Sequence, residues 1–345
     1  PVNQYLYVGD YLNSRILVFD LSSTTTSGMD ASFVIGQSSF TASTTATTAT
    51  GLNVPIDILY ASSTEKLFVS DYANHRITVY DLSDGLATSS EPAVNVLGAP
   101  DLTTRPSGTT QSSLEYPLGM IFGRNTSTLF VADNSDSRIV VYDIAEISNG
   151  EAAFAVIGQD DFTSEVDQAT QDGLNQWPGD LEYDYGNNRL YATDANNHRV
   201  LIYDFVTVES GSLTAGEVGT AYSQDIVSND QGTLTSEVTS GSLPPGLSLS
   251  GDTISGTPTT IGTYTFTVFA TDTFDNTGYF YDEQEMSIEI AQNLSDWSYR
   301  KKITIDADQV DADLTNFPVL VNFTADTNLA ASASSTGADI MFVSD

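Results

Sequence analysis

The sequence predicts an all-β protein in three parts: a fourfold strand repeat, a sandwich-type module and a third β-rich segment. Three observations support this prediction. Short runs of β-branched and aromatic residues recur at a fixed spacing through residues 1–209, the composition changes at residue 210, and it changes again at residue 294. No apolar stretch approaches the roughly 20 residues of a membrane span, so we expect no membrane insertion.

The repeat is clearest in an apolar strand that ends in Asp. Its four copies occupy residues 6–10, 67–71, 129–133 and 190–194, at intervals of 61, 62 and 61 residues. A second strand ending in Asp follows each copy, and a Pro opens the next unit. In three copies a Val-Ile-Gly or Val-Leu-Gly segment lies between this second strand and the Pro. Four short strands at this period indicate the blade of a β-propeller.

An Arg stands five residues after the Asp that ends the first of these strands in every copy. Arg presents a fork of donors that a carboxylate can accept bidentately, so we expect each pair to clamp the hairpin between the second and third strands. The four predicted clamps are Asp10/Arg15, Asp71/Arg76, Asp133/Arg138 and Asp194/Arg199.

The Asp-x-x-x-x-Arg element, with Asn-His-Arg at 74–76 and 197–199, resembles the NHL-repeat family of propellers. Gly-Gln-x-x-Phe at 36–40 and 158–162 carries the same resemblance. The resemblance covers about residues 5–205 and implies a β-propeller fold. It does not imply one function, because members of the family include scaffolds, ligand binders and a few lyases.

In lyases of similar fold, histidines near the channel hold a metal. Here His75 and His198 precede the clamp Arg at equivalent repeat positions, so we interpret them as part of the repeat. The first unit begins at its second strand and the fourth lacks a Gly-Gln segment. We therefore expect either the C-terminal part of a larger propeller or open edges that another chain completes.

Residues 210–293 carry the sequence pattern of a second β-rich module. Alternation at Tyr264, Phe266, Val268 and Ala270 indicates a half-buried strand. Pro-Pro-Gly-Leu at 244–247, followed by Ser-Gly-Thr-Pro, resembles the immunoglobulin-like, cadherin-related domain common in bacterial surface proteins. The resemblance implies an immunoglobulin-like β-sandwich over residues 210–293.

Some relatives of these sandwiches bind calcium between modules. Calcium takes several oxygen ligands, and Asp272, Asp275 and Asp282 lie near one end of the predicted strand. We predict calcium as a ligand here. The alternative is a solvated acidic turn.

Residues 294–345 resemble the opening of a lectin-like, jelly-roll-like module of bacterial and archaeal secreted proteins, and we expect this module to be cut short. Arg300, Lys301 and Lys302 form a basic cluster that could contact an acidic neighbour during assembly, or could be ordinary surface charge. Candidate glycosylation sites, each in an Asn-x-Ser/Thr sequence, are Asn125, Asn293 and Asn322.

The charge balance limits the kinds of molecule that the protein is expected to bind. With 46 acidic and 11 basic residues among 345, the formal net charge is -35, which disfavours nucleic acid and anionic membranes and favours cations. The absence of cysteine excludes disulfides and thiolate sites. Scarce Lys and abundant Ser and Thr favour an extracellular protein, the alternative being an acidic cytosolic one.

No Gly-x-Ser-x-Gly, His-Glu-x-x-His or P-loop fingerprint occurs, so we expect no enzyme. We predict an extracellular structural or adhesive cell-surface protein, a subunit of a fibre, stalk or layer, which self-associates or binds neighbouring surface proteins by strand addition. One alternative is a carbohydrate-binding adhesion module that uses Trp177 or Trp297, although we expect both indoles in the core. The other is a propeller lyase with a divalent metal in its channel.

Overall fold

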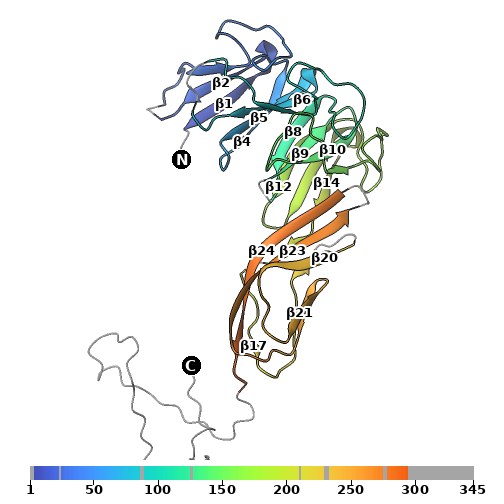
Figure 1. Ribbon diagram of the computed structural model, residues 1–345. Helices are drawn as coiled ribbons and strands as arrows, with labels where there is room; N and C mark the ends of the chain where they lie inside the picture. Colours follow the sequence, from blue (N-terminus) through green and yellow to red (C-terminus); the bar gives the residue numbers. More distant parts are fainter. Residues whose placement is uncertain are drawn as a thin grey trace, which may run out of the picture. The chain divides into compact units, whose positions relative to one another are not determined.

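The computed structural model describes residues 4–22, 25–85, 89–124, 127–209, 211–228, 233–274 and 278–293 (Figure 1). The chain divides into two units, Pro1–Ala291 and Gln292–Asp345. The described regular structure is β-strand apart from three short 3-10 turns, so the all-β prediction is confirmed. Within these ranges, none of the helical turns has the length or apolarity that crossing a membrane requires. The third predicted module, residues 294–345, lies outside the described residues.

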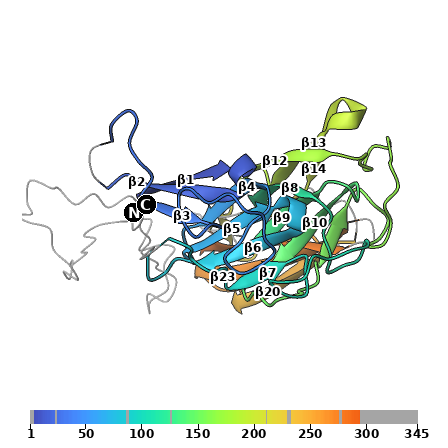
Figure 2. The same ribbon diagram turned by 90° about the horizontal axis from the view of Figure 1, so that it is seen from above.

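Four small antiparallel sheets follow one another along the first unit, one from each sequence repeat (Figure 2). Sheet 1 contains β1 (Tyr5–Asp10), β2 (Arg15–Asp20) and β3 (Phe33–Ile35). Sheet 2 contains β4 (Pro55–Ala61), β5 (Lys66–Asp71), β6 (Arg76–Asp81) and β7 (Asn95–Leu97). Sheet 3 contains β8 (Pro117–Phe122), β9 (Thr128–Asp133), β10 (Arg138–Asp143) and β11 (Ala155–Ile157). Sheet 4 contains β12 (Pro178–Asp184), β13 (Arg189–Asp194) and β14 (Arg199–Asp204).

The first strand of sheets 2, 3 and 4 starts at a proline and carries an irregularity in its pairing directly afterwards. Pro can open a strand there because its missing N–H costs little at a strand start or bulge. The residue before each Pro adopts a left-handed backbone, with φ of 56° at Val54, 55° at Tyr116 and 81° at Trp177. The chain therefore turns sharply before the first strand of these three sheets.

Consecutive sheets pack through the same two strands each time. The face of a sheet that meets the following sheet is called here its trailing face, and the face that meets the preceding sheet its leading face. β2, β6 and β10 each present two branched side chains on the trailing face of their sheet, and these meet the leading faces of β5, β9 and β13, respectively, in the next sheet. The fully buried trailing residues are Ile16, Val18, Ile77, Val79, Ile139 and Val141. Their partners, also fully buried, are Leu67, Val69, Leu129, Val131, Leu190 and Ala192.

The remaining strands of the first unit build the predicted sandwich. One sheet orders β16 (Gly211–Ser212), β24 (Gly278–Ala291), β23 (Gly262–Phe274) and β20 (Thr235–Gly241), and β17 (Gly216–Glu217) also pairs with β24. The other sheet orders β18 (Tyr222–Asp225), β22 (Thr253–Gly256) and β21 (Leu247–Ser250). A short pair joins β15 (Thr207–Val208) to β19 (Val227–Ser228). The predicted alternation in β23 is confirmed, because Phe266, Val268 and Ala270 are buried.

The hairpin of β23 and β24 is long enough to serve both the sandwich and the repeat sheets (Figure 1). Met286, Ile288 and Ile290 of β24 are buried in the sandwich core. Phe280, nearer the hairpin tip, stacks on Phe205 with ring centroids 4.4 Å apart. One continuous hydrophobic core therefore joins sheets 3 and 4 to the sandwich.

Candidate functional site

The structure brings together both members of every predicted clamp. Asp and Arg stand directly opposite each other where β1 turns into β2, β5 into β6, β9 into β10 and β13 into β14, as Asp71 and Arg76 do in sheet 2. Arg Nε lies 2.7, 2.7, 2.8 and 2.6 Å from Asp Oδ2 in sheets 1 to 4, in that order. These contacts hold hairpins rather than face a ligand.

Each clamp Arg also bonds to loop carbonyls. In sheet 2, Arg76 Nη1 donates to Leu102 O at 2.5 Å, and Nη2 donates to Thr48 O and Gly51 O at 3.0 Å. Arg138 makes the same kind of bond to Phe162 O, the last residue of a Gly-Gln-x-x-Phe segment. The two sequence motifs are thus bonded to each other, a link that sequence reasoning missed because they lie about 25 residues apart.

Sheet 3 differs from the others within its clamp. Asn74 donates to Asp71 Oδ2 at 2.8 Å, and Asn13 and Asn197 make the equivalent bond in sheets 1 and 4. Sheet 3 carries Asp136 at this position, with Oδ2 3.2 Å from Arg138 Nη2. Burial raises the pKa of Asp133 to about 8; Arg138 opposes the rise and the charge of Asp136 adds to it.

The two histidines occupy the left-handed position before the clamp Arg, with φ of 59° at His75 and 55° at His198. His tolerates this backbone conformation better than most side chains. His75 is buried, its Nε2 contacts Arg105, and its ring centroid lies 4.1 Å from that of Tyr116. Burial first, and then the Arg105 charge, lower the pKa of His75 to about 4, which keeps the ring neutral. His198 is exposed.

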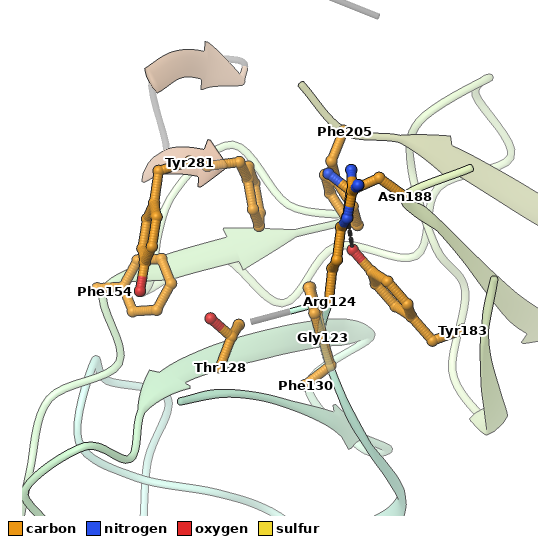
Figure 3. A pocket seen from close by; sticks show the side chains of 10 residues that line it. Gly123, Arg124, Thr128, Phe130, Phe154, Tyr183, Asn188, Phe205 and Tyr281 are labelled. Atoms are coloured by element: carbon orange, nitrogen blue, oxygen red, sulfur yellow. Dashed lines mark hydrogen bonds between the residues drawn. The ribbon is translucent and has the colours of Figure 1, made fainter. Parts of the chain in front are cut away.

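A small hollow lies where sheets 3 and 4 meet the tip of the long hairpin, lined by Arg124, Phe130, Tyr183, Phe205 and Phe280 among others (Figure 3). The Tyr183 hydroxyl donates to Asn188 Oδ1 at its wall. Its volume of ≈ 20 Å³ holds about one water molecule, whereas ligand pockets span roughly 300–1,000 Å³. This hollow is too small for a substrate or cofactor.

The Asp282 carboxylate, which bonds to Arg124 at the wall of this hollow, already has hydrogen-bond donors around it. It accepts hydrogen bonds from Arg124 Nη1 at 2.9 Å, from Val208 N at 2.8 Å and from Gln284 Nε2 at 3.1 Å. Asp272 lies on the same face of the hairpin and is also buried, so a solvated turn is the wrong description of both residues. Asp275 lies outside the described residues, and calcium binding by the three stays a prediction.

Over the described ranges, no three His, Asp or Glu side chains are grouped so that they could hold a metal ion.

The other predicted site residues fall mostly outside the described part of the chain. Asn293 is half-buried, and its carbonyl accepts from Gln292 Nε2 at 3.3 Å. Outside the described residues lie Asn125, Asn322, Arg300, Lys301, Lys302 and Trp297.

Trp177 is 59% exposed, so the expectation that it belongs to the core is wrong. It stands in the left-handed turn before β12 instead of on a strand face.

The open edge of β1 is the strongest candidate for a functional surface. Among the described strands β1 pairs only with β2, whereas the equivalent β5 and β9 each pair on both sides. Leu21 N donates to Gln4 O at 2.6 Å, which identifies that residue pair as hydrogen-bonded. Hydrogen-bonded pairs alternate along antiparallel strands, so the N–H groups of Tyr5, Tyr7 and Gly9 point away from β2.

Sheet 4 has the complementary open edge, because β14 pairs only with β13 in the described structure. Sheet 1 thus lacks a first strand and sheet 4 a fourth, within the residues described. Both gaps agree with the strand count read from the sequence.

Comparison with known proteins finds two separate likenesses. The family model described as "Putative Ig domain" matches residues 205–282. NHL repeat-containing protein 2 of Gallus gallus is 25% identical over 150 residues, which are 41% of this chain and 19% of that protein. The chain therefore spans about a fifth of the length of that curated relative.

Two solved structures are similar to the chain at lower sequence identity. An auxiliary nutrient binding protein from Bacteroides ovatus is 15% identical, with 58% of this chain and 45% of that chain covered and a TM-score of 0.40. The periplasmic gluconolactonase of Pseudomonas aeruginosa is 13% identical, with 84% and 68% covered and a TM-score of 0.34. Overlaps this low do not by themselves indicate a shared fold. In sequence, the chain is similar to an NHL-repeat protein and, over residues 205–282, to the immunoglobulin-like family.

Proposed function

We propose that this protein is an extracellular structural or adhesive component of a cell surface, a subunit of a fibre, stalk or layer. Its location outside the cell is supported by the immunoglobulin-like match and by the acidic, cysteine-free, lysine-poor composition. The observation that carries the proposal is the open edge of β1, where Tyr5, Tyr7 and Gly9 direct main-chain donors away from their own sheet.

Strand addition is the proposed mechanism of association. An unpaired strand edge presents alternating donors and acceptors, and a strand from another chain can satisfy all of them at once. The resulting hydrogen bonds fix the direction of the partner. The partner is a second copy of this chain or a neighbouring surface protein.

The experiment compares Tyr7→Pro with Tyr7→Ala in the full chain. Both variants lose the ring that stacks on Tyr60, but only proline removes the outward N–H at the middle of the edge. We expect the wild type and Tyr7→Ala to form oligomers or fibres at high protein concentration, seen by light scattering and electron microscopy. Tyr7→Pro should need at least tenfold higher concentration, and dispersed wild-type monomers at every concentration would contradict the proposal.

Carbohydrate binding is a second candidate, favoured by the exposure of Trp177. An exposed indole offers an apolar ring face on which a sugar ring can stack. Tyr116 holds the equivalent position before Pro117, and its ring centroid lies 4.9 Å from that of Tyr72. Binding to a glycan array that disappears in Trp177→Ala would support this role, and no binding by the wild type would remove it.

The propeller-lyase alternative has less support than these two functions. His75 already contacts Arg105 and Tyr116, and His198 differs from it in exposure. This difference supports the interpretation of both histidines as residues of the repeat.

A further inference from the structure

The trailing face of sheet 4 exposes two apolar residues that every other repeat buries. Val200 is 57% and Ile202 55% exposed on β14. At the same repeat positions, sheets 1, 2 and 3 carry Ile and Val residues that are fully buried because the next sheet covers them. Sheet 4 is followed by the sandwich instead, which leaves this pair uncovered.

The leading face of sheet 1 shows the matching exposure. Leu6 is 50% and Val8 38% exposed on β1. Sheets 2 to 4 carry Leu67, Leu129 and Leu190 at the position of Leu6, and all three are fully buried against the preceding sheet. The molecule thus exposes both halves of a contact that it makes three times internally.

We propose that sheet 4 of one copy packs its trailing face on the leading face of sheet 1 of a second copy. Val200 and Ile202 would meet Leu6 and Val8 just as Ile16 and Val18 meet Leu67 and Val69 within one chain. This inference rests on the proposed function, because it names the partner and a surface for self-association. The contact inferred here is made by apolar side chains on the sheet faces, whereas the strand addition proposed above is made by main-chain groups at the edge of β1.

The polar part of the sheet 4 face argues for a second copy as the partner. Asp180 and Glu182 on β12 are exposed. At the position of Glu182, sheets 2 and 3 carry Leu59 and Ile121, which pack into the cores they share with the following sheet. Within the described residues sheet 1 has no first strand, so its docked face leaves Asp180 and Glu182 in water.

The contact joins two different surfaces, so it is heterologous. After two copies pair, one still has a free sheet 1 face and the other a free sheet 4 face, so the contact repeats until it closes a ring or extends a filament. Four central side chains make a small apolar contact. The expected association is therefore weak and concentration-dependent for a single contact.

The test measures association of the full chain by sedimentation velocity at 0.5 M NaCl. Ile202→Lys places a charge in the proposed contact, and we expect it to raise the apparent dissociation constant at least tenfold. Ile261→Lys is the matched control, because Ile261 is 57% exposed but lies in the sandwich, and it should change the constant less than twofold. Ile202→Thr replaces Ile202→Lys if the lysine variant has a lowered melting temperature.

Mixing two defective chains tests the heterologous geometry. Leu6→Glu should also fail to associate alone. An equimolar mixture with Ile202→Lys should form dimers, because the intact sheet 4 face of one chain meets the intact sheet 1 face of the other. A mixture that stays monomeric overturns the inference.

The two proposals fail separately. If Tyr7→Pro abolishes assembly while Ile202→Lys retains it, the face contact is wrong and the edge mechanism stands. If Ile202→Lys abolishes assembly and Tyr7→Pro retains it, the face contact stands without the edge. A wild type that never associates overturns both.

Discussion

Asp136 places a carboxylate where the other three repeats carry an amide. The amide donates to the clamp Asp, as Asn74 does to Asp71, but an ionised carboxylate has no proton to donate. Two fully buried acids, Asp133 and Asp136, therefore share the single guanidinium of Arg138. Burial, with the Asp136 charge adding to it, therefore keeps Asp133 protonated above the usual range of a carboxyl group.

We predict that Asp136→Asn stabilises the protein by about 1–2 kcal/mol at pH 8, because it restores the missing donor and removes a like charge. Burial raises the folded-state pKa of Asp133 to about 8, so its contribution to stability is lost as pH rises from about 4 through 8. Removing the Asp136 charge lowers that pKa. The gain should therefore be small near pH 4 and grow toward pH 8.

Melting temperature measured across this pH range checks the prediction. Asn74→Asp provides the matched reverse change in sheet 2 and should destabilise. A gain that is independent of pH would mean that the Asp136 charge does not act on Asp133.

The hairpin of β23 and β24 connects the sandwich to the repeat sheets through polar contacts of Asp282 and a cluster of aromatic rings around Phe280. Asp282 links β24 to Arg124 and to the main chain of Val208, which lie in two different parts of the chain. Phe280 stacks on Phe205 beside it. Both residues come from the half of the hairpin that extends beyond the sandwich.

We predict that Asp282→Ala lowers the free energy of unfolding by about 1–3 kcal/mol, because it leaves the Arg124 and Val208 donors without their acceptor. Chemical denaturation of the full chain measures this loss. Glu289→Ala, at an exposed position of the same strand, should stay within about 0.5 kcal/mol of the wild type. Equal losses in the two variants would show that Asp282 is no more than a surface charge.

The net charge of -35 acts on the whole molecule, since two approaching copies repel each other. Salt screens this repulsion between exposed charges but leaves an apolar face or a strand edge almost unaffected. Assembly by the proposed edge and face contacts should therefore strengthen as salt is added.

We predict that light scattering of the full chain at fixed protein concentration rises between 0.05 and 0.5 M NaCl, over which the Debye length falls from roughly 14 to 4 Å. The opposite trend has a definite meaning. Association that weakens with salt would indicate attraction between unlike charges, which is the role predicted for Arg300, Lys301 and Lys302.

Local residue patterns account for what could be predicted of the fold. The strands and clamps recur with a fixed period because each hairpin is built from contacts only five residues apart, as between Asp71 and Arg76. Alternation likewise identified the buried face of β23. The prediction that Trp177 lies in the core was wrong because the exposure of a side chain depends on what packs against it. The sequence around the turn before Pro178 does not reveal which residues pack there.

The repeat, the sandwich and the incomplete strand count follow from short-range periodicity, so they can be predicted from the sequence alone. The pairing of Asp282 with Arg124, 158 residues away, and the exposure of Val200 and Ile202 are visible only in the folded chain. A repeat encodes similar apolar residues in every copy, whereas the burial of those residues depends on whether a neighbouring sheet is present to cover them.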